Sequence, residues 1–315
     1  MGIKNFNQLG FAEQFVRQRK TRKHSSLEQV DATVDWDPIM QILSVTRAKV
    51  GRKGYPPLLM FKALLLAQWH DLSDVELEYR VSDSLSFRKF VGLPLDHVAP
   101  DETSFVNFRK ALRQHQLEKK LFDEITRQLD ASGLILRKGT IMDATLVSAA
   151  VSRPSVEAGE VSEADPDAEF SKKNGKSYFG YKLHIGLDQG SGLIRKLLAS
   201  GASLHDGQAS EDLISWDEEQ VSADKAYESA ALRAKLRAQT IKDRIMRKKP
   251  KGKSAPIWQV WWNKTISSFR FEVEQVFGIG KECSGLERTR YRGLRQVKTQ
   301  FYLFGSAYNL KRAFG

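Results

Sequence analysis

The sequence predicts an α/β protein in which an all-helical N-terminal module precedes a mixed sheet with flanking helices. Three observations lead to this fold class. Apolar residues recur with helical spacing from residue 56 to about residue 129. After Gly133 the pattern changes to extended, largely apolar segments, the clearest of which covers residues 140–147. Beyond it, strand-like and helical segments alternate in an order that fits a mixed sheet with helices on its faces.

The helical module is expected to span residues 36–132. Two prolines, Pro56 and Pro57, suit the start of its first strongly apolar helix. Ser73 and Glu76 have the spacing of a capping box, and Asp101 can cap a later helix. Several short helices with little strand signal indicate a compact module, although helicity alone does not show that it binds DNA.

A polar arm, residues 1–35, precedes this module. It carries a basic cluster of Arg17, Arg19, Lys20, Arg22 and Lys23. Two interpretations stay open for this arm: contact with nucleic-acid phosphates, or a solvated and flexible tail.

The second domain is expected to cover residues 133–315. A polar, charged stretch at residues 152–176 holds two prolines and is interpreted as a loop or a disordered insert. The remaining strands are expected at residues 178–187, 194–200, 221–224 and 243–246, and the main helices at 228–239, 263–281 and 302–312.

Composition limits the class of partner. With 41% hydrophobic residues in 315, the chain can bury a substantial core. Its formal net charge of +12 favours a polyanion, either nucleic acid or an anionic membrane. The longest apolar stretch, residues 58–67, is interrupted by Lys62 and is too short for a membrane span. Nucleic acid is therefore the expected partner, and no membrane association is expected.

Cysteine usage and the N-terminus indicate the compartment. The single cysteine, Cys283, excludes an internal disulfide and a thiolate metal cluster within one chain. The first residues lack the apolar core of a signal peptide. Both features fit a reducing cytoplasm, which is the compartment we expect.

Three acidic residues stand out by position. Asp143 lies inside an apolar strand, where a carboxylate is costly unless it is paired or binds a metal. Asp224 ends a second strand. Glu274 lies in a helix, and at about 100° per residue Arg270 and Lys281 share its face within roughly 40°. An acid flanked by cations on one stripe suits an anionic substrate.

Carboxylates of this kind can support phosphodiester chemistry. That chemistry needs an activated water or hydroxyl and a stabilised leaving oxygen, and two hard cations about 4 Å apart supply both. Mg²⁺ is commonly held by one or two carboxylates together with substrate oxygens and water. The alternative is that each acid is a surface or capping residue in an ion pair.

Five short motifs in order resemble one protein family. Residues 270–281 have an Arg, three residues, Glu, six residues, Lys spacing, which is similar to the C-terminal signature of the "DDE" transposases of the insertion-sequence-five family, within the insertion-sequence-four superfamily. The other matching segments are residues 100–109, 143–145, 178–184 and 223–227. The resemblance covers roughly residues 30–312.

The resemblance implies a ribonuclease-H-like catalytic domain with Asp143, Asp224 and Glu274 as catalytic residues and ligands of Mg²⁺, for which Mn²⁺ can substitute. It implies that Arg270 and Lys281 contact phosphate near the cut site. Only 50 residues separate Asp224 from Glu274, which leaves no room for the large β-domain that some relatives insert there. Ala226 stands where the family usually has glycine, and Ser267 where some relatives have tyrosine.

The implied function is cleavage of double-stranded DNA at terminal inverted repeats and strand transfer into target DNA. The helical module would bind the repeats, and a homodimer would hold two ends in the synaptic complex. Further phosphate contacts are expected from two basic clusters, which include Lys248, Lys249, Arg290 and Arg292. Two rival functions stay open: a transposase-derived DNA-binding protein without catalysis, and a nuclease of the same fold.

Other candidate residues are weaker. His184 and the pair His205–Asp206 are a poor zinc signal and are interpreted as a strand residue and a turn. Glu272 is a rival for Glu274 but lies about 160° away on the helix, off the basic stripe. Base stacking and packing are both open for three tryptophans before the catalytic acid, Trp258, Trp261 and Trp262.

Overall fold

The computed structural model describes residues 26–46, 54–152, 162–173, 175–249, 252 and 254–314. The chain divides into two compact units. We call Met1–Ala131 with Tyr302–Gly315 the helical unit and Ser132–Phe301 the sheet unit. The basic cluster expected between Arg17 and Lys23 lies outside the described residues. In the described ranges, no helix combines the length and apolarity needed to cross a membrane.

The helical unit is built around α4, Pro57–Trp69. Side chains are buried at every position of α4 from Leu59 to Trp69, because other helices pack around it. Its one basic residue, Lys62, is only 6% exposed and pairs with Asp31 at 2.5 Å. The other helices are α2 Ser26–Thr33, α3 Trp36–Leu43, α5 Asp74–Asp83, α6 Leu85–Val91, α7 Glu102–Gln114, α8 Leu117–Ala131 and the C-terminal part of α11 Leu294–Phe314.

The helix starts of this unit follow the expected capping residues. The Ser73 hydroxyl accepts a hydrogen bond from the Glu76 backbone N–H at 3.2 Å, as the capping box predicts. Asp101 accepts from the Ser104 N–H at 2.7 Å at the start of α7. These contacts satisfy donors that the first helical turn leaves unpaired.

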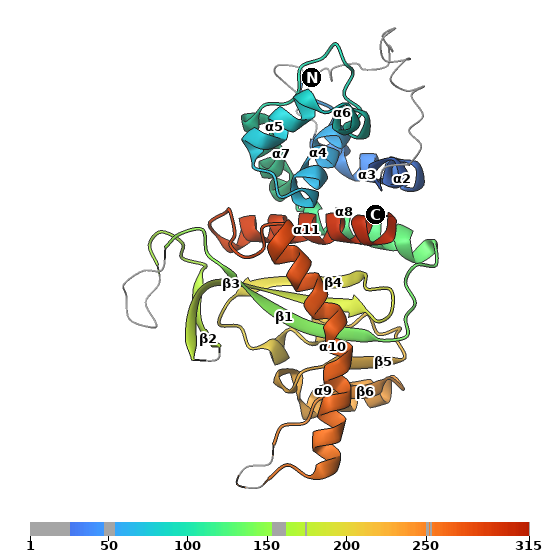
Figure 1. Cartoon of the computed structure of the whole chain (residues 1–315), viewed down its shortest axis with the longest axis vertical. Coiled ribbons are helices and arrows are strands. Elements are labelled where there is room, and N and C mark those ends of the chain that lie inside the picture. Colours follow the sequence, from blue (N-terminus) through green and yellow to red (C-terminus); the bar gives the residue numbers. More distant parts are fainter. Residues whose placement is uncertain are drawn as a thin grey trace. The chain divides into compact units, whose positions relative to one another are not determined.

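The sheet unit holds a mixed, six-stranded sheet (Figure 1). Its path is β2-β3-β1-β5-β6, and β4 also pairs with β3. β1, β3 and β4 are antiparallel neighbours, whereas β1, β5 and β6 run parallel. This is a ribonuclease-H-like arrangement, so the predicted fold class is confirmed. The strands are β1 Thr140–Ser148, β2 Glu169–Lys173, β3 Lys176–Asp188, β4 Ile194–Gly201, β5 Gln220–Ala223 and β6 Lys242–Ile245.

Strand β2 lies inside the stretch that the sequence indicated as a loop or disordered insert. It pairs with the start of β3 across a tight turn at Gly175, whose φ is +76°. β2 lies at the edge of the strand path, and edge strands tolerate charged residues. Because this segment is charged, the sequence indicated a loop rather than a strand. Residues 153–161 of the expected insert lie outside the described residues.

Two helices complete the sheet unit. α9, Ala230–Ala238, joins β5 to β6, and α10, Ile257–Cys283, crosses the sheet over β1 and β5 (Figure 1). α10 begins at Ile257 rather than near residue 263, because Pro256 occupies the capping position and the tryptophan-rich segment continues the helix.

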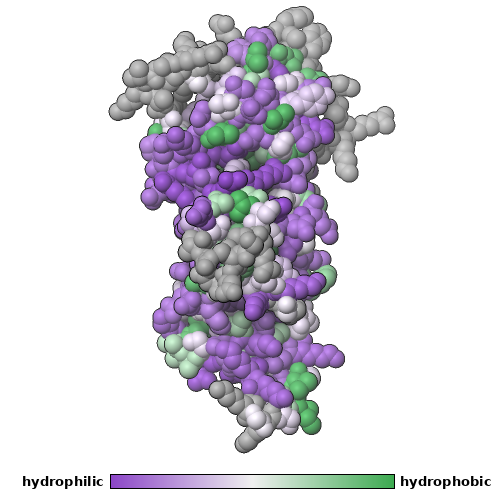
Figure 2. All heavy atoms as spheres, turned by 90° about the vertical axis from the view of Figure 1, so that its left-hand side faces the viewer, coloured by the Kyte–Doolittle hydropathy of each residue, from purple (hydrophilic) through white to green (hydrophobic). Residues whose placement is uncertain are grey.

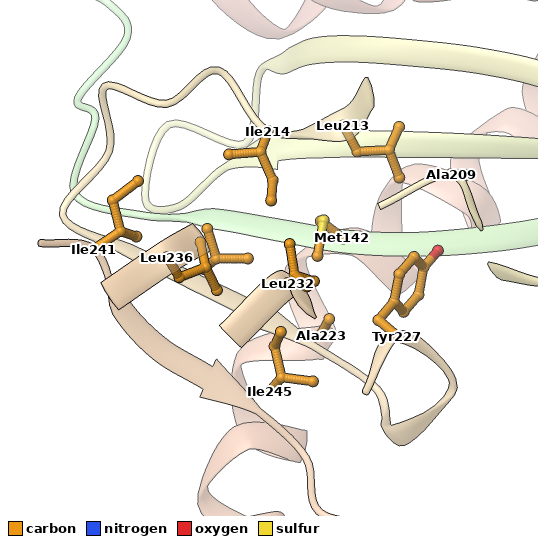
Figure 3. Packing of buried hydrophobic residues seen from close by; sticks show 11 residues of the cluster. Met142, Ala209, Leu213, Ile214, Ala223, Tyr227, Leu232, Leu236, Ile241 and Ile245 are labelled. Carbon is orange, nitrogen blue, oxygen red and sulfur yellow. The ribbon is translucent and has the colours of Figure 1, made fainter. Parts of the chain in front are cut away.

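Alternation along the strands assigns side chains to the two faces. Met142, Val221, Ala223 and Ile245 join a cluster with α9 residues (Figure 3). The side chains at the alternating positions of these strands point to the other face of the sheet and therefore face α10. The sheet thus offers an apolar face to α9 and a face with several polar side chains to α10.

Candidate functional site

Two of the predicted acids lie on neighbouring strands. β1 and β5 run parallel, with Met142 opposite Ala223, so Asp143 and Asp224 follow side by side. Each directly follows a residue that faces α9, so both aspartates are on the side of the sheet that faces α10. Their side chains are 13% and 31% exposed, which keeps Asp143 mostly shielded and Asp224 more accessible. Parallel pairing thus brings together two acids that are 81 positions apart in the sequence.

The third acid comes from α10. Val273 and Val276 of this helix are buried, which fixes the rotation of the helix over the sheet. Glu274 and Arg270 lie one turn apart, and the Glu274 side chain is 61% exposed. The helix therefore contributes one acid and one cation beside the two aspartates.

Arg270 lies among all three carboxylates. Its Nη2 donates a hydrogen bond to Asp143 Oδ2 at 2.8 Å. Its Nη1 is 3.9 Å from Asp224 Oδ2, and its Nη2 is 3.9 Å from Glu274 Oε1. The predicted acids thus converge on one guanidinium.

The charges of the acids act on this guanidinium. Burial on its own lowers the pKa of Arg270, but the charge of Asp143 and its hydrogen bond, with the charges of Asp224 and Glu274, outweigh burial and raise the pKa. Arg270 is therefore held in its charged form and neutralises part of the acid cluster.

The donor set fits a hard divalent cation, since carboxylate oxygens are the ligands that Mg²⁺ prefers. A positively charged group already lies among the three acids, so their field suits a cation. Asp143 Oδ1 accepts from the Ala144 N–H at 2.9 Å, and Asp224 Oδ1 accepts from the Lys225 N–H at 2.6 Å. Each aspartate thus keeps one oxygen fixed by backbone. Among the described residues no three acidic, histidine or cysteine side chains have ready metal-binding geometry.

A packed layer supports the site from the α9 side. Tyr227 belongs to the apolar cluster of Figure 3 and is 1% exposed. Burial raises the pKa of Tyr227, as do the charges of Asp206, Asp143 and Asp224, while Arg270 opposes them. Asp206 in turn accepts from Lys182 Nζ at 3.0 Å. Asp206 is thus a fourth carboxylate that acts on Tyr227, and the sequence indicated it only as part of a weak His–Asp pair.

The other predicted phosphate contacts are exposed. Lys281 lies on α10 two turns after Glu274, and Lys248, Lys249, Arg290 and Arg292 are exposed elsewhere in the sheet unit. Lys248 is partly engaged, because its Nζ donates to the Glu228 carbonyl at 3.4 Å. One face of the molecule is mostly hydrophilic, with hydrophobic residues in small separate groups (Figure 2). These features are compatible with a polyanionic partner.

The weaker candidates have other contacts. Glu272 accepts a hydrogen bond from the Gly190 N–H at 2.9 Å and so supports the turn between β3 and β4. His184 lies in β3 and approaches the Ser200 hydroxyl at 2.9 Å, and His205 caps a short 3₁₀ turn, as the sequence indicated. Trp258 and Trp261 are 60% and 65% exposed, whereas Trp262 donates to the Ile245 carbonyl.

Sequence reasoning missed the buried carboxylate of Asp188. Asp188 is fully buried at the end of β3 and accepts from the N–H groups of Leu136 and Arg137 at 2.9 and 2.8 Å. Its role is structural, because it fixes the segment that leads into β1. Its position in an apolar strand resembles that of Asp143, so apolar context alone does not distinguish a site residue.

Comparison with known families decides the membership of the chain. The family described as "Transposase DDE domain" matches residues 136–310, more than half of the chain. The chain belongs to the DDE transposase family. A second family, described as "Transposase domain (DUF772)", matches residues 14–111 of this transposase. The chain is thus a DNA-processing protein of a family whose domains generally use divalent metal ions.

Among solved structures, the transposase is similar to one described as a "piggyBac transposase synaptic complex with hairpin DNA". The sequence identity is 12%, the TM-score is 0.48, and the match covers 92% of this chain and 74% of the other. A likeness this distant says nothing about the substrate or assembly of the present transposase.

Proposed function

We propose that the chain is a transposase of the insertion-sequence-five family that cuts DNA at terminal inverted repeats and joins the freed end to target DNA. The observation that carries the proposal is the convergence of Asp143, Asp224 and Glu274 on one guanidinium, from two strands and a covering helix. The Arg270, Glu274 and Lys281 spacing of that family lies on the same helix.

In this proposal the three acids hold the divalent ions, Mg²⁺ with Mn²⁺ as a substitute. When bound, the ions supply an activated water or 3′-hydroxyl and stabilise the leaving oxygen. The protein's part is to orient the acids: the backbone N–H groups of Ala144 and Lys225 each fix one aspartate oxygen. Glu274 is the most exposed of the three and faces solvent, from which DNA arrives.

Basic side chains position the DNA. Arg270 and Lys281 would pair with phosphates near the cut, and Lys248, Lys249, Arg290 and Arg292 would follow the backbone further away. Such contacts fix register without reading sequence. The helical module predicted at residues 36–132 would bind the repeats, and a homodimer would hold two ends. We place this activity in the bacterial cytoplasm.

The test is a strand-transfer assay with the full-length protein, a labelled duplex that carries the end of its own element, a target plasmid and Mg²⁺. The expected result is a nicked duplex together with a joined product. Glu274→Gln should abolish both, whereas Asp212→Asn, which removes an exposed acid elsewhere in the sheet unit, should leave both unchanged.

The two rival functions give different results. Nicking without any joined product identifies a nuclease of the same fold. Binding of the duplex with no nicking in Mg²⁺ or Mn²⁺ identifies a DNA-binding protein without catalysis. Either result removes the proposed strand transfer.

A further inference from the structure

The three acids of the site share one cation in the described structure. Arg270 donates a hydrogen bond to Asp143, its one hydrogen bond among the described residues, and is 3.9 Å from both Asp224 and Glu274. Three carboxylates in one place repel one another, and the repulsion is strong where burial limits screening by water. One guanidinium removes only part of this excess negative charge, so the acids retain a strong attraction for a second cation.

A divalent ion and the guanidinium compete for the same oxygen. Mg²⁺ binds carboxylate oxygen at about 2.0–2.1 Å. Asp143 Oδ2 accepts from Arg270, whereas Oδ1 accepts from the Ala144 N–H. Two positive groups on one oxygen also repel each other. The guanidinium in this position therefore weakens binding of the ion, and binding of the ion in turn favours movement of the guanidinium away from Asp143.

The contacts of Arg270 permit this movement. Its side chain is 20% exposed, so a path to solvent exists. Its Nε makes no hydrogen bond with any described residue, and its distances to Asp224 and Glu274 exceed hydrogen-bond length. Within the described ranges, release of Arg270 thus breaks one hydrogen bond, to Asp143, while the ion takes over the charge compensation.

We propose that Arg270 is the resident counter-ion of the acids before metal binds, and that metal entry displaces its guanidinium toward a DNA phosphate. This inference rests on the proposed function, in which Asp143, Asp224 and Glu274 hold the metal. It gives Arg270 two successive partners, first a carboxylate and then a phosphate. Metal binding and phosphate binding then favour each other, because both stabilise the state in which the Arg270 guanidinium has left Asp143.

The test measures Mn²⁺ binding to the full chain without DNA, by electron paramagnetic resonance. Arg270→Gln removes the competing charge, so Mn²⁺ should bind about tenfold more tightly than to the wild type, or about 1.4 kcal/mol. Lys264→Gln is the matched control, since it removes one charge from the exposed side of the same helix. It should bind Mn²⁺ as the wild type does.

A second variant guards against misfolding. Arg270→Lys keeps the charge but loses the planar fork, and it should tighten Mn²⁺ binding about threefold. Circular dichroism establishes that both variants are folded. Equal or weaker Mn²⁺ binding in a folded Arg270→Gln protein overturns the inference. If Arg270→Gln does not fold, an unchanged Mn²⁺ affinity in Arg270→Lys overturns it instead.

The proposed function fails in a different way. If Asp143→Asn and Asp224→Asn bind Mn²⁺ as the wild type does, the acids are not the metal ligands and the proposed function loses its site. If both variants lose Mn²⁺ while Arg270→Gln binds no more tightly than wild type, the proposed function stands and only the counter-ion role is wrong.

Discussion

His184 makes the stability of the sheet unit sensitive to acid. Its ring is fully buried on β3, with Nε2 at 2.9 Å from the Ser200 hydroxyl. The pKa of His184 is lowered from 6.5 to about 4, chiefly by burial. The charge of Asp206 opposes this shift, and the charge of Lys182 adds to it. The folded protein therefore keeps this ring neutral at pH values where the unfolded chain is already protonated.

The direction and size of the effect follow from the two pKa values. Because the folded pKa is the lower one, His184 costs little stability above pH 6.5, and the cost grows as the pH falls toward 4. At pH 5, protonation of His184 in the unfolded chain lowers the free energy of unfolding by about 2 kcal/mol. A shift of that size changes the ratio of folded to unfolded protein about thirtyfold.

The assay is urea unfolding at pH 7 and pH 5, for the wild type and for His184→Gln. Glutamine can still hydrogen-bond Ser200 but does not titrate. The wild type should lose about 2 kcal/mol more than the variant between the two pH values. Equal losses in the two proteins would show that His184 is not held neutral in the fold, and the reasoning from burial would then be wrong.

Three further predictions concern single contacts. Tyr227→Phe removes a buried hydroxyl that has no hydrogen-bond partner among the described residues. The free energy of unfolding in urea should therefore stay the same or rise by up to about 1 kcal/mol. Arg109→Leu leaves Asp74 without its buried partner and should cost about 2 kcal/mol in the same assay, since Asp74 is partly solvated; no change would contradict a role for this pair. Arg290→Gln with Arg292→Gln should lower the salt dependence of DNA binding by about two phosphate contacts, and an unchanged slope would remove them from the interface.

Much of the sheet unit was predictable because burial leaves a periodic trace. Residues 140–147 read as a strand, and β1 covers Thr140–Ser148. The expected cap at Ser73 and the C-terminal helical pattern were also found. These features depend on local chemistry, which a single sequence carries.

Strand β2 was not predictable in the same way. Its sequence is charged, and only its pairing with β3 makes it a strand. Gly180, which pairs with Glu169 of β2, is a second example. Its φ is +154°, and a Cβ there would lie 2.2 Å from the Val147 carbonyl. The need for glycine appears only when β1 and β3 are placed together.

The candidate site also has a part that the sequence predicted and a part that only the folded structure reveals. The residue types and spacing singled out Asp143, Asp224 and Glu274, and the family membership is shown for the chain. The sequence assigned Arg270 to phosphate, and its contact with Asp143 was not foreseen, because 127 residues separate the two. Asp188 shows the converse case, in which an acid in an apolar strand serves the fold.

The central claim is that the three acids form the metal-dependent centre of DNA cleavage. Its most direct test is the single-turnover rate at which the full-length protein nicks a duplex carrying its element's end in Mg²⁺. Asp224→Asn should reduce this rate by about 1000-fold or more, because several kcal/mol of transition-state stabilisation depend on the bound ions. Asp212→Asn should nick at the wild-type rate. An Asp224→Asn protein that nicks as fast as the wild type contradicts the account.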